Sequence, residues 1–286
     1  MINPRTQLTA DQLQKPGIAA GQVDNAFFAP IEPAGEAQHG LAASIAIPQT
    51  PMQSNQPGVK VNGKAIDVFP AVILRLSSSE GDLVPLDRGL LRDPDGDSYW
   101  DLTLSPGKVF FEASDGRWSR AALPFQLSNI FENDTHHGIA TFLFNETDIS
   151  SIFFQIVAET KAFLVPDNLL AWGWLEGRVQ SLGLDECDLA RKAYREEKRD
   201  RLPMKSLNIW HSQATEDLMR DIGQGFGSDS SIVNGLVKDE VIYVTPCRTA
   251  RGDYPYPRSM RFGIWSATKT AFCTIATLLY AIMANL

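Results

Sequence analysis

The 286-residue sequence contains little cysteine, and none of it is spaced like a metal site. Its three cysteines, Cys187, Cys247 and Cys273, are far apart and odd in number. Structural zinc sites take closely spaced cysteine pairs, and small secreted scaffolds take an even set. The sequence therefore predicts neither a zinc site nor a disulfide framework, and it gives no other sign of a metal or cofactor.

Positive charge is also scarce. The chain has 26 Lys and Arg against 34 Asp and Glu, which gives a net charge of −8 and a pI near 5.1. Proteins that bind nucleic acids or anionic membrane surfaces are typically basic, so we expect no nucleic-acid partner. The N-terminus lacks a basic stretch followed by an apolar core, so no signal peptide is visible.

The chain has no apolar run long enough to cross a membrane. Its most apolar stretch, Ala271–Leu286, covers sixteen residues and includes Thr274 and Thr277. A transmembrane helix needs about 20 residues. A helix that is apolar on every side belongs in a domain core, so we expect a buried core helix and no transmembrane span.

Four stretches of different texture divide the chain. Residues 1–58 are rich in Pro and Gly without periodicity, which predicts an extended or partly disordered arm. Residues 59–180 predict a β-rich accessory domain, an antiparallel sheet or sandwich. Residues 181–204 mix charges at helical spacing and predict a helical linker with a solvated face. Residues 205–286 form the last stretch. We expect an α+β fold class, in which the β-rich domain precedes this last stretch.

Short apolar segments bounded by turns predict the strands. Asn62-Gly63 between alternating residues is a strong hairpin signal. A second hairpin is expected over residues 231–245, around Lys238-Asp-Glu. The other expected strands are residues 71–76, 100–104, 108–112, 138–144 and 152–157.

Ser266 and Lys269 stand at the start of the apolar C-terminal stretch. In a helix they lie one turn apart on the same face. A lysine is rarely buried unless it is paired, and the helix macrodipole opposes a positive charge in the first turn. Both effects favour the neutral amine, which can take the proton of a neighbouring hydroxyl and make the serine a nucleophile.

The segment Ser266-Ala-Thr-Lys269 resembles the S-x-x-K motif of serine β-lactamases and penicillin-binding proteins. Its lead-in, Arg258-Ser-Met-Arg-Phe-Gly-Ile-Trp265, is most similar to the branch of class C β-lactamases, esterases and D-aminopeptidases. The resemblance covers about residues 205–286. It implies the first part of a β-lactamase-like α/β catalytic domain and a periplasmic or secreted protein.

The resemblance also implies a mechanism. Ser266 would attack an ester, amide or lactam carbonyl, Lys269 would act as the base, and an acyl-serine intermediate would be hydrolysed. The backbone N–H of Ser266 would form half of an oxyanion hole. The family's Tyr-x-Asn and Lys-Thr-Gly elements follow the nucleophile, yet only seventeen residues follow Lys269 and none matches. We therefore expect the N-terminal portion of a hydrolase, inactive by itself and completed by a complementary C-terminal polypeptide.

Two other interpretations remain open. Ser266 is also a preferred helix N-cap, with Lys269 extending to solvent. The chain would then be a non-catalytic binding protein with a β-rich ligand-binding domain and a degenerate hydrolase remnant. Its ligand surface would use the aromatic side chains Trp100, Phe110, Phe111 and Trp118. Aromatic side chains at strand spacing more often belong to the core.

Several further motifs give only weak evidence for a functional site. Asp93-Pro-Asp-Gly-Asp97 lacks the ligand spacing of a calcium loop and predicts a polar turn. His136 and His137 are adjacent, so in a strand they point to opposite faces and make no ready metal pair. Gly223-x-Gly-x-Gly227 does not follow a strand, which argues against a dinucleotide site. Arg251-Gly-Asp253 matches an adhesion tripeptide, but these are three common loop residues. Asn133 and Asn145 stand in formal glycosylation acceptor sequences.

Overall fold

The computed structural model describes residues 5–15, 21–31, 34–129, 135–159, 169–207, 209, 233–261 and 267–284, with residues 158–159, 267–271 and 284 described by their backbone. The first half of the chain contains α1 (Ala10–Gln14), η1 (Asn25–Phe28), β1 (Ala42–Ile47), β2 (Thr50–Pro51), β3 (Gln53–Ser54), β4 (Lys60–Val61), β5 (Lys64–Ala65), β6 (Val68–Phe69), β7 (Val72–Ser79), β8 (Asp82–Pro85), β9 (Leu90–Leu91), β10 (Asp101–Leu104), β11 (Gly107–Phe110), η2 (Ala113–Asp115) and β12 (Ser119–Ser128). The second half contains β13 (Thr135–Phe144), β14 (Ile152–Glu159), β15 (Ala171–Leu175), β16 (Arg178–Ser181), α2 (Leu184–Arg199), β17 (Met204–Ser206), β18 (Gly235–Lys238), β19 (Val241–Val244), β20 (Arg248–Thr249), β21 (Gly252–Asp253), η4 (Pro257–Ser259) and α5 (Ala267–Ala284).

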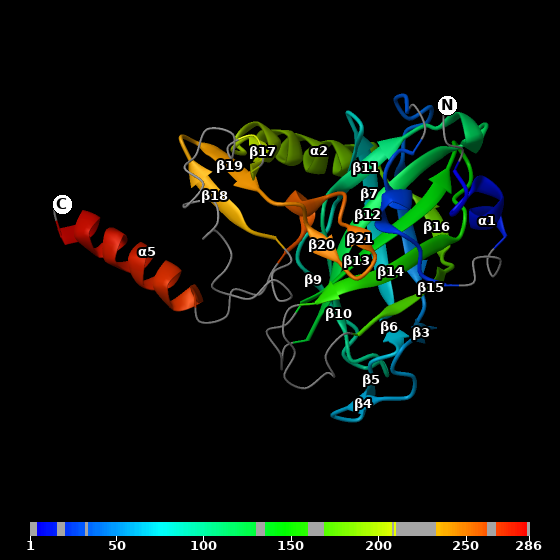
Figure 1. The fold of residues 1–286 in the computed structure, drawn as a ribbon, viewed down its shortest axis with the longest axis horizontal. Coiled ribbons are helices and arrows are strands. Elements are labelled where there is room, and N and C mark those ends of the chain that lie inside the picture. The colour runs from blue at the N-terminus through cyan, green and yellow to red at the C-terminus, as the bar shows by residue number, and fades with distance from the viewer. Residues whose placement is uncertain are drawn as a thin grey trace.

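One large antiparallel sheet dominates the described chain (Figure 1). Its twelve strands include the path β16-β1-β7-β8-β11-β12-β13-β14-β15-β3, and β10 and β9 continue from β12. The predicted strands at residues 71–76, 100–104, 108–112, 138–144 and 152–157 correspond to β7, β10, β11, β13 and β14. The prediction of a β-rich part with an antiparallel sheet is confirmed.

The sheet curls back on itself. Strands β15 and β16 lie near opposite ends of the strand order, yet Glu176 and Gly177 are the only residues between them. At this crossing a Cβ on Gly177 would lie 2.7 Å from Ile45 and from Ile47 of β1, so the close approach requires glycine. The curled sheet encloses a core of apolar side chains from most of its strands.

Strands β12, β13 and β14 are buried on both faces. Side chains alternate between the faces of a strand, and β14 shows the result. Phe154 points into the enclosed core and Phe153 points outward into a second apolar cluster. Neighbouring strands add to both clusters in the same way, which explains the nearly unbroken burial of β12 and β13.

The N-terminal segment is part of the folded structure. Residues 1–58, expected to form an extended arm, provide β1, which pairs with β7 and β16. They also provide Leu8, Leu13 and Phe28, which are fully buried in the outer cluster. The segment has no periodicity of its own because it covers an apolar face formed by other strands.

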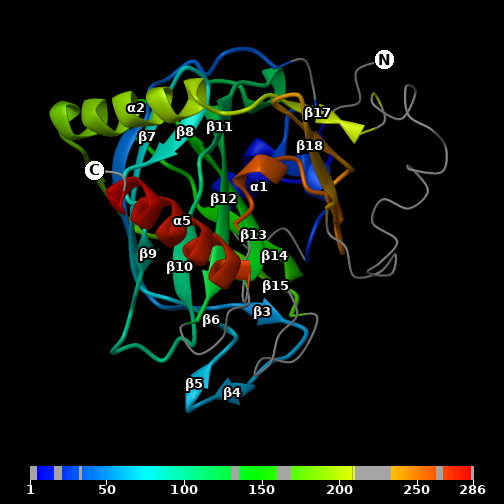
Figure 2. The ribbon, with the colours of Figure 1, turned by 90° about the vertical axis from the view of Figure 1, so that its left-hand side faces the viewer.

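Both predicted hairpins are confirmed. Asn62 and Gly63 join β4 to β5, and Asp239 and Glu240 join β18 to β19, with positive φ at all four residues. The predicted helix over 181–204 is present as α2, which packs against β7 and β8 (Figure 2). The other side chains of α2 are exposed or partly exposed, as the predicted solvated face requires, while Cys187 and Tyr194 are buried.

Candidate functional site

The predicted S-x-x-K motif lies next to the apolar C-terminal helix. The described residues of helix α5 are Ala267–Ala284, and they include Lys269, which is described by its backbone. Ser266 lies outside the described residues. The pairing of the two side chains therefore stays a prediction.

The expected burial of this helix was wrong for the described chain. The large apolar side chains of α5 are all more than half exposed, from Leu279 at 56% to Tyr280 at 76%. Figure 1 shows the helix standing apart from the sheet. Its apolar composition had predicted a core position, but the described strands complete their own cores without it. Among the described residues, no helix is both long and apolar enough to cross a membrane.

The segment that leads to α5 is fastened to the outer face of the sheet. Tyr254 is buried in the outer cluster, and its hydroxyl donates to the carbonyl of Gly138 in β13 over 2.9 Å. Tyr256 donates to the carbonyl of Phe28 over 3.0 Å. Cys247 and Met260 lie in the same cluster. The chain is thus held on the β-rich part up to Arg261, six residues before α5 begins.

Two of the four aromatic side chains predicted for a ligand surface lie in the core. Trp100 is 1% exposed, and its indole N–H donates to the carbonyl of Ile66 over 2.8 Å. Phe110 is also buried, whereas Phe111 and Trp118 are partly buried. Trp118 packs against the outer cluster. Trp100 and Phe110 therefore stabilise the β-rich part and do not line a ligand surface.

The adjacent histidines are buried in β13. The ring of His136 lies 4.6 Å from that of Trp100, and Nε2 of His137 lies 3.4 Å from the hydroxyl of Thr135. Burial, and then the neighbouring His136, lowers the pKa of His137 to about 3. In the described chain no group of His, Cys, Asp and Glu side chains has the arrangement of a metal site.

The other predicted motifs make hydrogen bonds within the fold. Asp93 accepts from the Gln49 amide over 2.7 Å and from the backbone N–H of Ala71 over 3.1 Å. The Asn145 side chain accepts from the backbone N–H groups of Thr147 and Asp148. Arg251 donates from Nε to Gln22 over 2.8 Å. Residues 223–227 and Asn133 lie outside the described residues.

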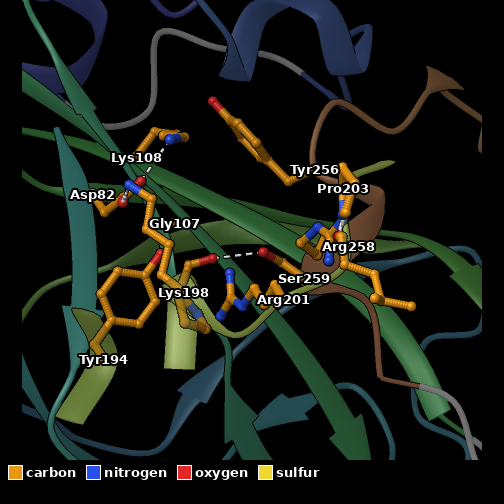
Figure 3. Close-up of a pocket in the computed structure, with 12 residues that line it drawn as sticks. Asp82, Gly107, Lys108, Tyr194, Lys198, Arg201, Pro203, Tyr256, Arg258 and Ser259 are labelled. Carbon is orange, nitrogen blue, oxygen red and sulfur yellow. Dashed lines mark hydrogen bonds and ion pairs between the residues drawn. The ribbon is translucent and has the colours of Figure 1, made fainter. Parts of the chain in front are cut away.

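A polar groove that the sequence did not predict lies between α2, the β8–β11 edge and the segment 256–261. It consists of two adjoining pockets of about 330 and 280 Å³, which share Pro106, Arg201, Arg258 and Ser259. Figure 3 shows the larger pocket. We call the two pockets together the cationic groove, since its basic side chains are Arg88, Lys108, Lys198, Arg201, Arg258 and Arg261.

Two carboxylates stand among these six cations, and each is already paired. Asp82 accepts from Lys108 over 2.5 Å and from Lys198 over 2.6 Å. Burial raises the pKa of Asp82, but the hydrogen bonds from the two lysines outweigh this effect and bring the pKa below its ordinary value. Because Lys198 is on α2, this pairing also fastens the helix to β8.

Glu197 is the second carboxylate. Arg88 and Arg201 both pair with it, Arg201 over 2.6 Å. The hydrogen bond from Arg88 is the main reason that the pKa of Glu197 falls to about 2. Arg201 also lies over the ring of Tyr194, 5.3 Å from its centroid. The two carboxylates of the groove are thus ionised and occupied at neutral pH.

Two arginines of the groove have no carboxylate partner among the described residues. Arg258 donates to the carbonyl of Leu202 over 2.7 Å, and Arg261 donates to the carbonyl of Arg88 over 3.0 Å. Burial, and then the charge of Arg201, lowers the pKa of Arg258. Burial, and then the charge of Arg88, lowers the pKa of Arg261. Arg258 thus faces Arg201, and Arg261 faces Arg88 with Glu197 as the nearby counter-charge.

Comparisons with protein-family models, with curated proteins and with solved structures found no match to this chain. The function is therefore argued from its own residues.

Proposed function

We propose that the chain is the N-terminal part of an S-x-x-K serine hydrolase of the β-lactamase-like superfamily. Ser266 is the nucleophile and Lys269 is the base, and the substrate is an ester, an amide or a lactam. The observation that supports the proposal is helix α5, whose described residues, Ala267–Ala284, follow Ser266 directly and include Lys269. In the proposal the serine lies at the mouth of this apolar helix and the lysine in its first turn, as the motif requires.

The helix start accounts for the chemistry of the pair. The positive end of the helix dipole disfavours an ammonium group in the first turn, which favours the neutral amine of Lys269. The amine takes the proton of the Ser266 hydroxyl as its oxygen bonds to the substrate carbonyl carbon. The leaving group departs with a proton, and water then cleaves the acyl-serine ester to free the acid and restore the serine.

The β-rich part has a supporting role in this proposal. It fixes the segment that ends at Arg261, through Tyr254 and Tyr256, and so determines where the nucleophile helix emerges. The exposed apolar side chains of α5 give the helix a surface to bury against a complementary C-terminal polypeptide, which would also supply the second oxyanion donor.

The experiment measures hydrolysis by the polypeptide isolated from its source, with p-nitrophenyl acetate and a D-amino-acid anilide as substrates. Ser266→Ala should abolish turnover. Lys269→Ala should lower kcat by about 10²–10⁴-fold, the usual contribution of a general base. Ser151→Ala, on the surface of the β-rich part, is the matched control and should leave the rate unchanged. Turnover that survives Ser266→Ala would contradict the proposal.

The second candidate function is a non-catalytic binding protein. The observation that favours it is the cationic groove, which lies in the β-rich part and involves neither Ser266 nor Lys269. Under this alternative the isolated protein binds its ligand but shows no turnover that depends on Ser266. The hydrolysis experiment therefore separates the two functions.

A further inference from the structure

We propose that the cationic groove binds a small polyphosphate anion, of which pyrophosphate is the simplest member. The inference goes beyond the proposed hydrolase, because it concerns a second site with its own ligand. It rests on three properties of the groove, namely its charge, its unused donors and its shape.

The charge of the groove is opposite to that of the whole molecule. Six basic side chains face two carboxylates, so the groove has an excess of four positive charges in a chain of net charge −8. Asp82 and Glu197 each pair with two of the cations, but the single negative charge of each compensates only one of them. Gathering further cations costs free energy through mutual repulsion unless an anion compensates them. A bound polyanion supplies that compensation.

Arginine N–H groups that bind no carboxylate line both pockets, and most of them lie in the smaller one. Arg258 lines both pockets, and its only hydrogen bond to a described residue goes to a backbone carbonyl. Arg261 lines the smaller pocket and has the same kind of partner. In that pocket, Nε of Arg88 is buried without a hydrogen-bond partner among the described residues. Guanidinium groups bind the oxygens of phosphate in pairs, so Arg258 and Arg261 fit one phosphate in the smaller pocket. In the larger pocket Arg258 stands with Lys108 and Lys198, which supply positive charge for a second phosphate.

The shape of the groove selects a short ligand. Pockets of about 330 and 280 Å³ are at the small end of the range for ligand sites. Arg201 and Arg258 line both pockets, and Figure 3 shows them in the larger one. A ligand with two linked anionic groups can place one group in each pocket. A single monovalent anion would fill one pocket and leave the other uncompensated.

The bound anion would join two separate parts of the chain. Arg201 follows α2, whereas Arg258 and Arg261 belong to the segment that precedes α5. Because the ligand would contact both, it would tighten the attachment of that segment to the β-rich part. Binding should therefore raise the thermal stability of the protein, which gives a readout that does not require catalysis.

The experiment measures pyrophosphate binding by isothermal titration calorimetry and by the shift of Tm, at constant ionic strength set with sodium chloride. The wild type should bind pyrophosphate and gain stability. The variant Arg258→Gln/Arg261→Gln should lose at least tenfold in affinity and show no Tm shift. The control Arg117→Gln/Arg178→Gln removes the same charge from exposed positions elsewhere and should bind as the wild type does.

A second variant and a second anion make each outcome of the experiment decisive. Arg258→Lys/Arg261→Lys keeps both charges but removes the planar donors, and it should also weaken binding, which covers the case in which the glutamine variant does not fold. Citrate tests whether carboxylates serve as well as phosphates, and equal affinity for both would overturn the assignment to phosphate. Absence of binding to the wild type at millimolar pyrophosphate, or an equal loss in the control variant, would overturn the site itself.

Discussion

A buried histidine shows how one residue can make the stability of this protein depend on pH. His137 is fully buried in β13, and burial followed by the neighbouring His136 lowers its pKa to about 3. An unfolded histidine has a pKa near 6.5. Between those values the unfolded chain binds a proton that the folded chain does not, so stability is lost as the pH falls.

We expect this residue to contribute up to about 1.4 kcal/mol of lost stability per pH unit across that window. Urea unfolding at pH 6.5 and pH 4.5 measures the effect as a difference in the free energy of unfolding. His137→Gln should reduce that difference by about 2 kcal/mol, because the carboxylates titrate equally in both proteins. An unchanged difference would show that His137 takes up its proton in the folded state.

At the residue scale the sequence could not reveal the cationic groove. Its charged side chains come from residues 82–108, from 197–201 and from 258–261, and no local pattern connects them. The charge run that contains Lys198 and Arg201 looks like an ordinary solvated helix face. Only the fold shows that its last turn faces Asp82 and Arg258.

At the scale of elements, the strands and hairpins that could be predicted were those whose own residues favour the turn or the strand. Asn62-Gly63 adopts the positive φ values that its turn needs, and β10 alternates buried and partly exposed residues. Strand β12 was missed because Pro124 lies in its middle, where a central strand rarely tolerates proline. The structure explains it, since Pro124 lies between the stretches of β12 that pair with β11 and with β10.

The N-terminal segment depends on buried ion pairs for its attachment. Arg120 donates to Asp115 over 2.5 and 2.9 Å and to the carbonyl of Leu8 over 2.8 Å. Arg5 pairs with Glu112 over 2.7 Å. All four charged side chains are completely shielded from solvent. Removal of one partner leaves the other charge buried and unpaired, which is the costly case for an ion pair.

Arg120→Met should therefore lower the free energy of unfolding by about 3–5 kcal/mol. Denaturant unfolding measures the loss. Arg199→Gln is the control, because the Arg199–Asp200 pair is 73% and 69% exposed and such pairs contribute about 0–1 kcal/mol. The added change Asp115→Asn in the Arg120→Met background should recover part of the loss. A loss below 1 kcal/mol in the single variant would contradict the assigned role of this pair.

At the scale of the whole molecule, the β-rich part and the predicted catalytic helix differ in how fully their apolar side chains are buried. The curled sheet has two apolar clusters, and the outer one is covered by the N-terminal segment together with Tyr254 and Met260. Helix α5 has no comparable cover for its described apolar side chains. The apolar run behind Ser266 predicted the helix correctly, but burial depends on what packs against it, and no sequence pattern encodes that.

The central proposal is that Ser266 is an activated nucleophile, and covalent labelling tests it most directly. The protein from its native source is treated with a fluorophosphonate, digested, and the modified residue is identified by mass spectrometry. We predict one adduct, on Ser266, that is absent from Ser266→Ala and strongly reduced in Lys269→Ala. A native protein that takes up no probe at Ser266 would contradict the hydrolase and leave the serine as the cap of α5.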